Sequence, residues 1–224
     1  LLRPHLQHFG DCHHAQPGAV YISQATELGT LYTVEEVRAI ASLVHAHGMK
    51  LHMDGARLAN ACAALGCTMR EVTVDAGVDI LSLGGTKNGM MMGEAVVAFR
   101  EGVATDIKYY SKQSAQLASK MRYLSAQFIP YLDGLWLRNA QHANRQARRL
   151  AAALARFPQL RLTQPVETNQ LFIAMPRSVI ARLSERYFFY VWNEAADEVR
   201  FVTSWDTTDE DIDALVDALA EIME

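Results

Sequence analysis

Residues 79–89 read DILSLGGTKNG, a short apolar run that leads directly into a lysine flanked by glycines. An apolar run without polar alternation is typical of a β-strand buried on both faces. Glycines permit tight turns and close backbone approach to a ligand, so we expect Lys87 on a compact loop just after a strand. A lysine in a partly desolvated turn is a nucleophile suited to Schiff-base chemistry. An ordinary surface lysine is the alternative, while the spacing of a phosphate-loop motif is absent.

A second polar cluster, DGAR at residues 54–57, follows another predicted strand at residues 49–53. A carboxylate at a strand end can bind a metal, act as a base or pair with a cationic ring nitrogen. Metal binding is the least favoured, because His52 is expected to point to the opposite face of the strand from Asp54. Asp54 taken alone is equally compatible with a structural role.

The first half of the chain alternates strand and helix patterns. Further strands are predicted at residues 19–22 and 95–99, the first of them buried on both faces. A capping box formed by Thr33 and Glu36 opens a helix that ends at Gly48, and a short helix spans residues 58–65. This alternation predicts an α/β fold with a mostly parallel sheet and helices on both faces. In such sheets, ligands bind beyond the carboxyl ends of the strands, where both polar clusters fall.

The second half of the chain begins with long helical patterns in place of the alternating strands and helices. A long helical stretch from residue 102 to 125 is interrupted by Pro130, and another helix follows over residues 135–156. The rest reads as a small α+β unit that closes with a helix opened by Thr207 and Glu210. The expected strands cover 170–174, 187–192 and 200–205, and the expected helix covers 177–186. We predict two domains, residues 1–130 as a partial large domain and residues 131–224 as a small C-terminal domain.

Composition excludes several classes of protein. The 224 residues are 50% hydrophobic and 21% charged, with a net charge of −4, as in an ordinary globular protein. No apolar run approaches the roughly 20 residues of a membrane-spanning helix, so no membrane partner is expected. We expect no nucleic-acid partner, because the arginines at 138, 145, 148 and 149 have the spacing of a solvated helix face. Three cysteines without CxxC spacing favour a cytoplasmic location.

Residues 51–61, LHMDGARLANA, and residues 79–89 together resemble the threonine aldolase and β-eliminating lyase family. The likeness runs from about Val20 to the end of the chain, through residues 22–30, 112–125 and 199–206. These are enzymes dependent on pyridoxal 5′-phosphate (PLP). The resemblance implies an α/β, fold-type-I PLP-dependent transferase-like fold, with a partial large domain and a small C-terminal α+β domain.

The resemblance also implies cofactor-binding roles. Lys87 matches the lysine that binds PLP covalently, and Asp54 matches the aspartate that pairs with the pyridine nitrogen. Thr86 stands where the family has a hydroxyl near the cofactor phosphate, and Arg57 belongs to the same site. Lys112 resembles a basic residue that reaches the phosphate from a neighbouring subunit. No metal is implied.

The substrate roles fall on three positions. Arg57 and Arg200 match two arginines that contact the substrate carboxylate, which a planar guanidinium binds in bidentate fashion. The two guanidiniums are therefore expected to face a common cleft near Lys87. Many relatives have a histidine where this chain has Glu27, so the base for the substrate hydroxyl is open between Glu27, a water and a residue outside this chain.

The implied activity is PLP-dependent retro-aldol cleavage of L-threonine, L-allo-threonine or related β-hydroxy-α-amino acids, with phenylserine among the candidates, to glycine and an aldehyde. Another PLP-dependent β-eliminating lyase or racemase is one alternative, and a non-catalytic truncated remnant is another. Relatives of this kind are homotetramers, so a homo-oligomer arranged as a dimer of dimers is implied.

The beginning of the chain departs from the family pattern. No counterpart of the family's cofactor-stacking histidine or Gly-Thr phosphate site precedes Gln24, and the histidines at 5, 8, 13 and 14 are not substitutes. Cys12, His13 and His14 are expected to form a surface run rather than a metal cluster. We therefore expect the chain to match the C-terminal two-thirds of such an enzyme, and residues 1–224 alone not to be a competent aldolase.

Overall fold

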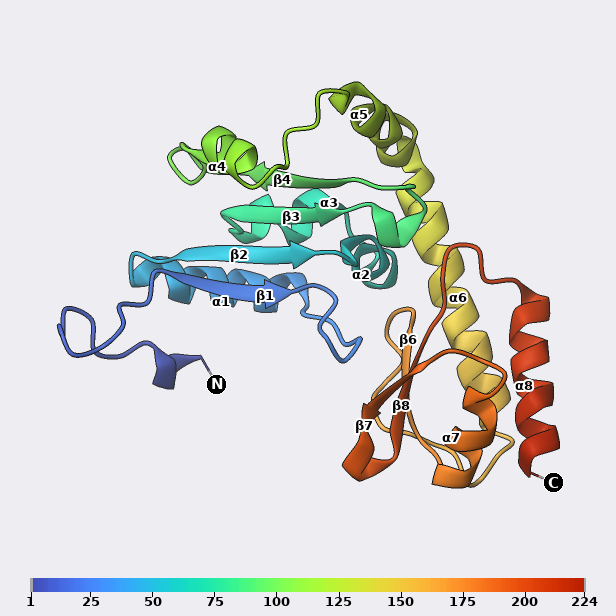
Figure 1. Ribbon diagram of the computed structural model, residues 1–224. Helices are drawn as coiled ribbons and strands as arrows, with labels where there is room; N and C mark the ends of the chain where they lie inside the picture. Colours follow the sequence, from blue (N-terminus) through green and yellow to red (C-terminus); the bar gives the residue numbers. More distant parts are fainter. Residues whose placement is uncertain (1, 224) are drawn as a thin grey trace.

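Two β-sheets organise the chain in the computed structural model, which describes residues 2–223 (Figure 1). The first sheet has the order β1-β2-β3-β4, with β1 at Ala19–Ser23, β2 at Lys50–Gly55, β3 at Ile80–Gly84 and β4 at Glu94–Ala98. The first three strands are parallel, and β4 runs antiparallel to β3. The predicted α/β class with a mostly parallel sheet is confirmed.

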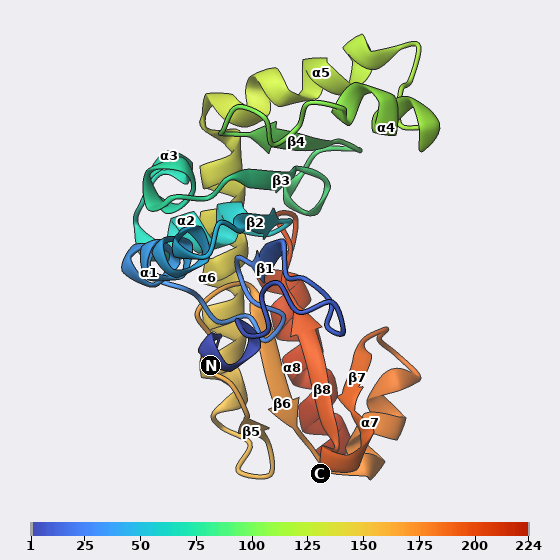
Figure 2. The same ribbon diagram turned by 90° about the vertical axis from the view of Figure 1, so that its left-hand side faces the viewer.

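The helices of this half, α1 (Val34–Ala46), α2 (Leu58–Leu65) and α3 (Met69–Val72), all lie on one face of the first sheet (Figure 2). On the opposite face, the side chains of Tyr21 and Val96 are 57% and 56% exposed. The prediction of helices on both faces is therefore wrong for the described residues. The strand at residues 19–22 buries one face only, because alternate side chains of a strand point to opposite sides.

Local signals at the helix ends are confirmed. The Thr33 hydroxyl accepts the Glu36 amide at 3.2 Å, and the Glu36 carboxylate accepts the Thr33 amide at 2.8 Å. The helix α2 ends at Gly66, whose φ of +66° lies in the left-handed region that glycine adopts without strain. A second capping box, between Thr68 and Glu71, opens α3.

The long helix expected over residues 102–125 is in fact two helices, α4 (Ile107–Gln113) and α5 (Met121–Pro130). The chain reverses between them, with Ala115 at a φ of +55°. No residue of α4 or α5 is buried, so no apolar face holds them in one continuous helix. Pro130 is the last residue of α5, and α6 (Trp136–Leu154) begins a turn later.

The second sheet is antiparallel and has the order β5-β6-β8-β7. Its strands are β5 (Arg161–Leu162), β6 (Gln170–Ala174), β7 (Tyr190–Asn193) and β8 (Glu198–Val202). The strands expected at 187–192 and 200–205 are thus displaced, by a few residues each, toward the short turn that joins β7 and β8. Its apolar face packs against α6, α7 (Arg177–Ser184) and α8 (Asp209–Met223).

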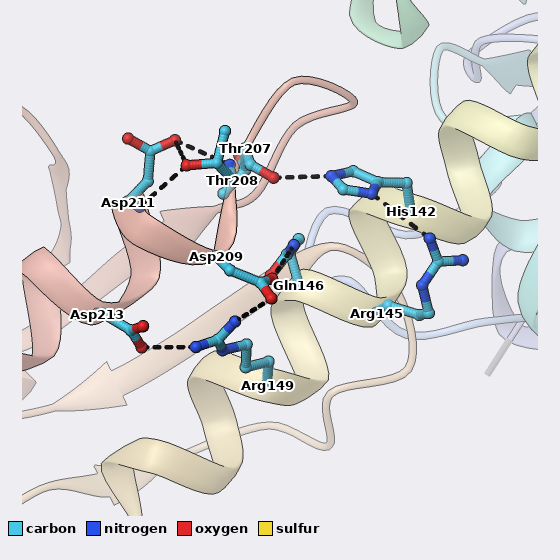
Figure 3. A network of polar contacts seen from close by, with 9 residues as sticks. All are labelled: His142, Arg145, Gln146, Arg149, Thr207, Thr208, Asp209, Asp211 and Asp213. Carbon is cyan, nitrogen blue, oxygen red and sulfur yellow. Dashed lines mark hydrogen bonds and ion pairs between the residues drawn. The ribbon is translucent and has the colours of Figure 1, made fainter.

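The final helix starts one residue later than predicted. Thr208, not Thr207, caps it, since the Thr208 hydroxyl accepts the Asp211 amide at 3.1 Å and the Asp211 carboxylate accepts the Thr208 amide at 2.8 Å. Figure 3 shows how α8 is held against α6: Arg149 lies 2.5 Å from the Asp209 carboxylate and 2.7 Å from that of Asp213. Of the four arginines at 138, 145, 148 and 149 on α6, at least Arg149 is thus paired with acids of its own chain.

Two hydrophobic cores accompany the two sheets, and α6 reaches both. Trp136 packs at the edge of the first core, whereas Leu150 and Leu154 are buried in the second. The division into residues 1–130 and 131–224 stays a prediction. No helix among the described residues is long and apolar enough to cross a bilayer.

Asp79, immediately before β3, is a buried ionic centre beside the first sheet. Its carboxylate accepts the Leu51 amide at 2.7 Å and lies 2.8 Å from the His45 ring and 2.6 Å from the Arg100 guanidinium. Burial opposes ionisation, but the Leu51 amide, His45 and Arg100 outweigh it and hold the pKa of Asp79 below its ordinary value of 3.8.

We expect Asp79→Asn to lower the free energy of unfolding by about 3 kcal/mol at pH 7, because it removes one partner from a buried ion pair. The folded-state pKa is lower than the unfolded one, so this stability is complete above about pH 5 and is lost as the pH falls through the folded value. Urea denaturation of both proteins between pH 7 and pH 3 should show the gap closing in acid. Asp75→Asn, at an exposed pair, is the control and should cost less than about 1 kcal/mol. A gap that widens in acid would contradict the assignment.

Candidate active site

Asp54 lies near the carboxyl end of β2, on the sheet face that carries no helix. Its Oδ1 accepts the Ala56 amide at 2.8 Å, and its Oδ2 accepts the Tyr21 hydroxyl at 2.6 Å. The hydrogen bond to Asp54 raises the pKa of Tyr21. A carboxylate has about four acceptor positions, so Asp54 can receive a further N–H donor from the open side of the sheet.

His52 stands beside Asp54 on the same face. Its Nε2 lies 3.0 Å from the Ser82 hydroxyl, and its ring meets the Tyr21 ring edge-on with centroids 5.1 Å apart. The prediction that His52 points to the opposite face is wrong, because residues two apart on a strand share a face. Tyr21, His52, Asp54 and Ser82 therefore form one polar row across β1, β2 and β3.

Lys87 is exposed in a short 3₁₀ turn, Thr86–Asn88, that follows β3 directly. Asp54 pairs in register with Ser82 of β3, so the end of β2 and the Lys87 turn lie at the same edge of the sheet. The predicted placement of Lys87 after a strand agrees with the structure. Thr86, also exposed, accepts the Gly93 amide through its hydroxyl at 3.2 Å.

The turn is held from inside by Asn88, which is buried while Lys87 is not. Its side-chain amide donates to the Trp136 carbonyl at 2.9 Å and to the Tyr131 hydroxyl at 3.2 Å. The Tyr131 hydroxyl in turn donates to the Gly84 carbonyl at 3.2 Å. A side chain at Gly89 would clash, since its Cβ would lie 2.5 Å from Nδ2 of Asn139. These contacts fix the backbone that presents Lys87.

Asn88→Ala should lower the free energy of unfolding by about 2 kcal/mol, because it leaves the Trp136 carbonyl and the Tyr131 hydroxyl without their donor. Lys87→Ala is the matched control on the adjacent exposed residue and should change stability by less than about 0.5 kcal/mol. Urea denaturation measures both. Equal losses in the two variants would show that Asn88 does not anchor the turn.

Arg57 follows β2 of the first sheet, and Arg200 lies on β8 of the second sheet, near enough for the charge of Arg200 to act on Arg57. Arg57 precedes α2 and is half-buried; burial and the charge of Arg200 lower its pKa, while the charges of Glu27 and Asp54 oppose that change. Arg200, on β8, stacks on Trp192 and Tyr190 at 4.8 Å and 5.3 Å from the ring centroids. Its Nε is buried and has no hydrogen-bond partner among residues 2–223.

Glu27 is exposed in the turn between Thr26 and Thr30, near enough for its charge to act on Arg57. This turn is bonded to the segment that precedes β6 of the second sheet, because the Thr168 hydroxyl donates to the Gly29 carbonyl at 2.9 Å. The turn therefore bridges the two halves of the chain beside the arginines.

Lys112 is the one predicted site residue that the chain does not bring to this edge. It is exposed on α4, which lies at the far end of the strands from α2 and from the Lys87 turn (Figure 1).

Sequence reasoning missed Tyr21, Asn88, Tyr131 and Trp192 as residues that support the site. Period-two alternation in residues 19–23 could have placed Tyr21 on the same sheet face as Asp54, since β1 and β2 are adjacent parallel strands. The contacts of Tyr131 and Trp192 leave no local signal, because they depend on elements that meet only in the folded chain.

The mostly parallel sheet with its lysine turn after β3 has the architecture of fold-type-I PLP-dependent enzymes. A family model described as beta-eliminating lyase matches residues 2–177, and the chain belongs to that family, one of PLP-dependent enzymes. Because the match begins at residue 2, the expectation that the family likeness starts only near Val20 is wrong.

Two similar proteins are each called low specificity L-threonine aldolase. One, from Pseudomonas sp. (strain NCIMB 10558), is 43% identical over 95% of this chain and 62% of its own length. The other, from Pseudomonas aeruginosa, is 46% identical over 88% of this chain and 57% of its own length. The chain thus spans about 60% of the length of the curated relatives it matches.

Solved structures agree on the fold. A threonine aldolase from Leishmania major superposes with a TM-score of 0.91 at 30% identity, over 100% of this chain and 66% of its own. A PLP-dependent aminotransferase from Streptococcus suis superposes with a TM-score of 0.70 at 16% identity, over 92% of this chain and 57% of its own. The second likeness shows the fold alone.

Proposed function

We propose that this chain carries the cofactor- and substrate-binding residues of a PLP-dependent aldehyde-lyase. The substrates are L-threonine, L-allo-threonine or related β-hydroxy-α-amino acids such as phenylserine, and the products are glycine and an aldehyde. The observation that carries the proposal is that Asp54 and the Lys87 turn lie at one edge of the sheet, where the charges of Asp54 and Arg200 both act on Arg57. The relatives at 43% and 46% identity support the choice of reaction.

The residues present fit PLP. Lys87 offers an exposed amine on a fixed turn, and Asp54 has free acceptor capacity for the N–H of a pyridinium ring. Thr86 offers a hydroxyl next to Lys87 for the cofactor phosphate. When bound, PLP would act as an electron sink that allows a bond at the substrate Cα to break.

The arginines explain how a substrate would be oriented. Burial is the main cause of the lowered pKa of Arg57, and the positive charge of Arg200 adds to it. A substrate carboxylate between the two guanidiniums would offset that charge and satisfy the buried Nε of Arg200. A carboxylate held in this way fixes Cα, and the orientation of Cα decides which of its bonds is broken.

We propose Glu27 as the group that accepts the proton of the substrate hydroxyl. Its support is its position: an exposed carboxylate on a fastened turn beside the arginines that would hold the carboxylate. A water molecule or a residue outside this chain is the alternative base.

Lys112 suggests that the working protein is a homo-oligomer, in keeping with the proposed dimer of dimers. Within the chain Lys112 lies at the far end of the sheet, so it would serve the phosphate only in the site of a neighbouring subunit. Cys12, Cys62 and Cys67 are all free, which accords with the proposed cytoplasmic location.

Product analysis separates the proposed reaction from its neighbours in PLP chemistry. The test uses this chain and a chimera in which it replaces the matching segment of the Pseudomonas sp. relative, each with PLP. With the chimera, L-threonine should yield equal amounts of glycine and acetaldehyde, whereas residues 1–224 alone should not be a competent aldolase. Ammonia with a 2-oxo acid would instead identify a β-eliminating lyase, and D-allo-threonine, formed by inversion at Cα, would identify a racemase. No product from the chimera would leave the aldolase proposal without support.

A further inference from the structure

The segment ahead of β1 folds into a tight loop that Gln16 holds closed. The Gln16 side-chain amide donates to the carbonyls of His8, Asp11 and His14 at 3.1, 2.9 and 3.1 Å. Its carbonyl oxygen accepts the Gly10 amide at 2.7 Å. One side chain therefore fixes the backbone from which these three residues project.

This closure gathers the side chains of His8, Asp11 and His14. The rings of His8 and His14 lie with centroids 4.0 Å apart, and Nε2 of His14 is 3.5 Å from Oδ2 of Asp11. One ligand atom from each residue lies within 4.8 Å of the others. A hollow of about 440 Å³ opens beside the two histidines, with His5 on its wall.

We propose that His8, Asp11 and His14 form a binding site for a divalent transition-metal ion, with zinc as the best fit. Two imidazoles and one carboxylate suit zinc, whereas magnesium and calcium prefer oxygen ligands alone. Zinc bonds of about 2.0–2.1 Å place tetrahedral ligand atoms about 3.4 Å apart. The two histidines are exposed, so rotation about their side-chain bonds can close the remaining gap.

The set is open on one side, toward the hollow. Three protein ligands leave the fourth position of a tetrahedral zinc to water or a small anion. Asp11 can bind the zinc through one oxygen and keep its local hydrogen bond through the other. Its Oδ1 accepts the His13 amide at 2.9 Å, and its Oδ2 is the oxygen nearest His14. A metal here would tie the loop together independently of Lys87 and the arginines.

The test is a calorimetric titration of the full chain with zinc chloride in a non-chelating buffer. We expect one zinc ion per chain with a dissociation constant below about 10 µM. His8→Ala and His14→Ala should each weaken binding at least tenfold. His5→Ala, an exposed histidine on the same hollow, is the matched control and should leave binding within twofold.

Cobalt gives a second readout, since its visible absorption reports the geometry of directly bound ligands. A tetrahedral cobalt spectrum should appear with the unaltered chain and vanish with His8→Ala, while the melting temperature of the metal-free variant stays unchanged. Asp11, Cys12 and His13 form an overlapping candidate set. Loss of binding in Cys12→Ser or His13→Ala but not in His8→Ala would overturn the proposal, as would equal losses in His5→Ala and His8→Ala, or no zinc binding at all.

Discussion

Replacing Lys87 by alanine should lower threonine cleavage by at least about 10³-fold, which corresponds to about 4 kcal/mol in the barrier. The expectation follows from the proposed role of its amine as the covalent attachment point for the cofactor, a function no neighbouring group can supply. Lys87 is exposed, so the variant should remain folded. Activity is measured in the chimera, and folding by circular dichroism.

Lys50→Ala is the matched control for this experiment. Lys50 is also exposed, but it begins β2 at the end of the strand remote from Asp54. The Lys50→Ala variant should retain activity within about twofold. This is much less than the tenfold change in rate that corresponds to about 1.4 kcal/mol in the barrier. Retention of most activity by Lys87→Ala would remove the lysine from the reaction.

Arg57→Ala and Arg200→Ala should each raise KM or lower kcat/KM for threonine by about 10- to 150-fold, the equivalent of losing one charged hydrogen bond of about 1.5–3 kcal/mol. If both guanidiniums hold one carboxylate, the free-energy loss calculated from kcat/KM of the double variant should differ clearly from the sum of the losses of the two single variants. Residues that share a partner show coupling of about 0.5–3 kcal/mol in such cycles. Independent, additive effects would mean that the arginines bind different groups.

Two further variants sharpen the test of the arginines. Arg145→Ala changes an exposed arginine on α6 and should leave kcat/KM unchanged. Arg57→Lys keeps the charge but loses the bidentate geometry, so it should recover only part of the loss. Full recovery by lysine would reduce the role of Arg57 to its charge.

Local signals in the sequence predicted local structure well. The Thr33–Glu36 capping box and the glycine at the end of α2 were sufficient because each involves residues a few positions apart. The lysine turn was also predictable, since an apolar strand followed by glycines leaves few alternatives. These features need no knowledge of distant parts of the chain.

The failures concern burial and long-range contact. An apolar run at residues 19–22 predicts a strand but not whether both of its faces are covered. The break between α4 and α5 depends on the absence of an apolar surface to pack against, which helical periodicity does not reveal. The approach of Arg57 to Arg200 depends on how α6 and the Thr26–Thr30 turn join the two sheets; only the family resemblance suggested it.

The central claim is that Lys87 is the lysine that receives PLP, and the chain allows a sharp test because it holds five lysines, all of them exposed. The protein is incubated with stoichiometric PLP, reduced with borohydride, digested and mapped by mass spectrometry. The pyridoxyl group should be found on the peptide containing Lys87, at least tenfold above Lys50, Lys108, Lys112 and Lys120, and L-threonine should diminish it. Equal labelling of all five lysines, or labelling concentrated on another one, would contradict the account.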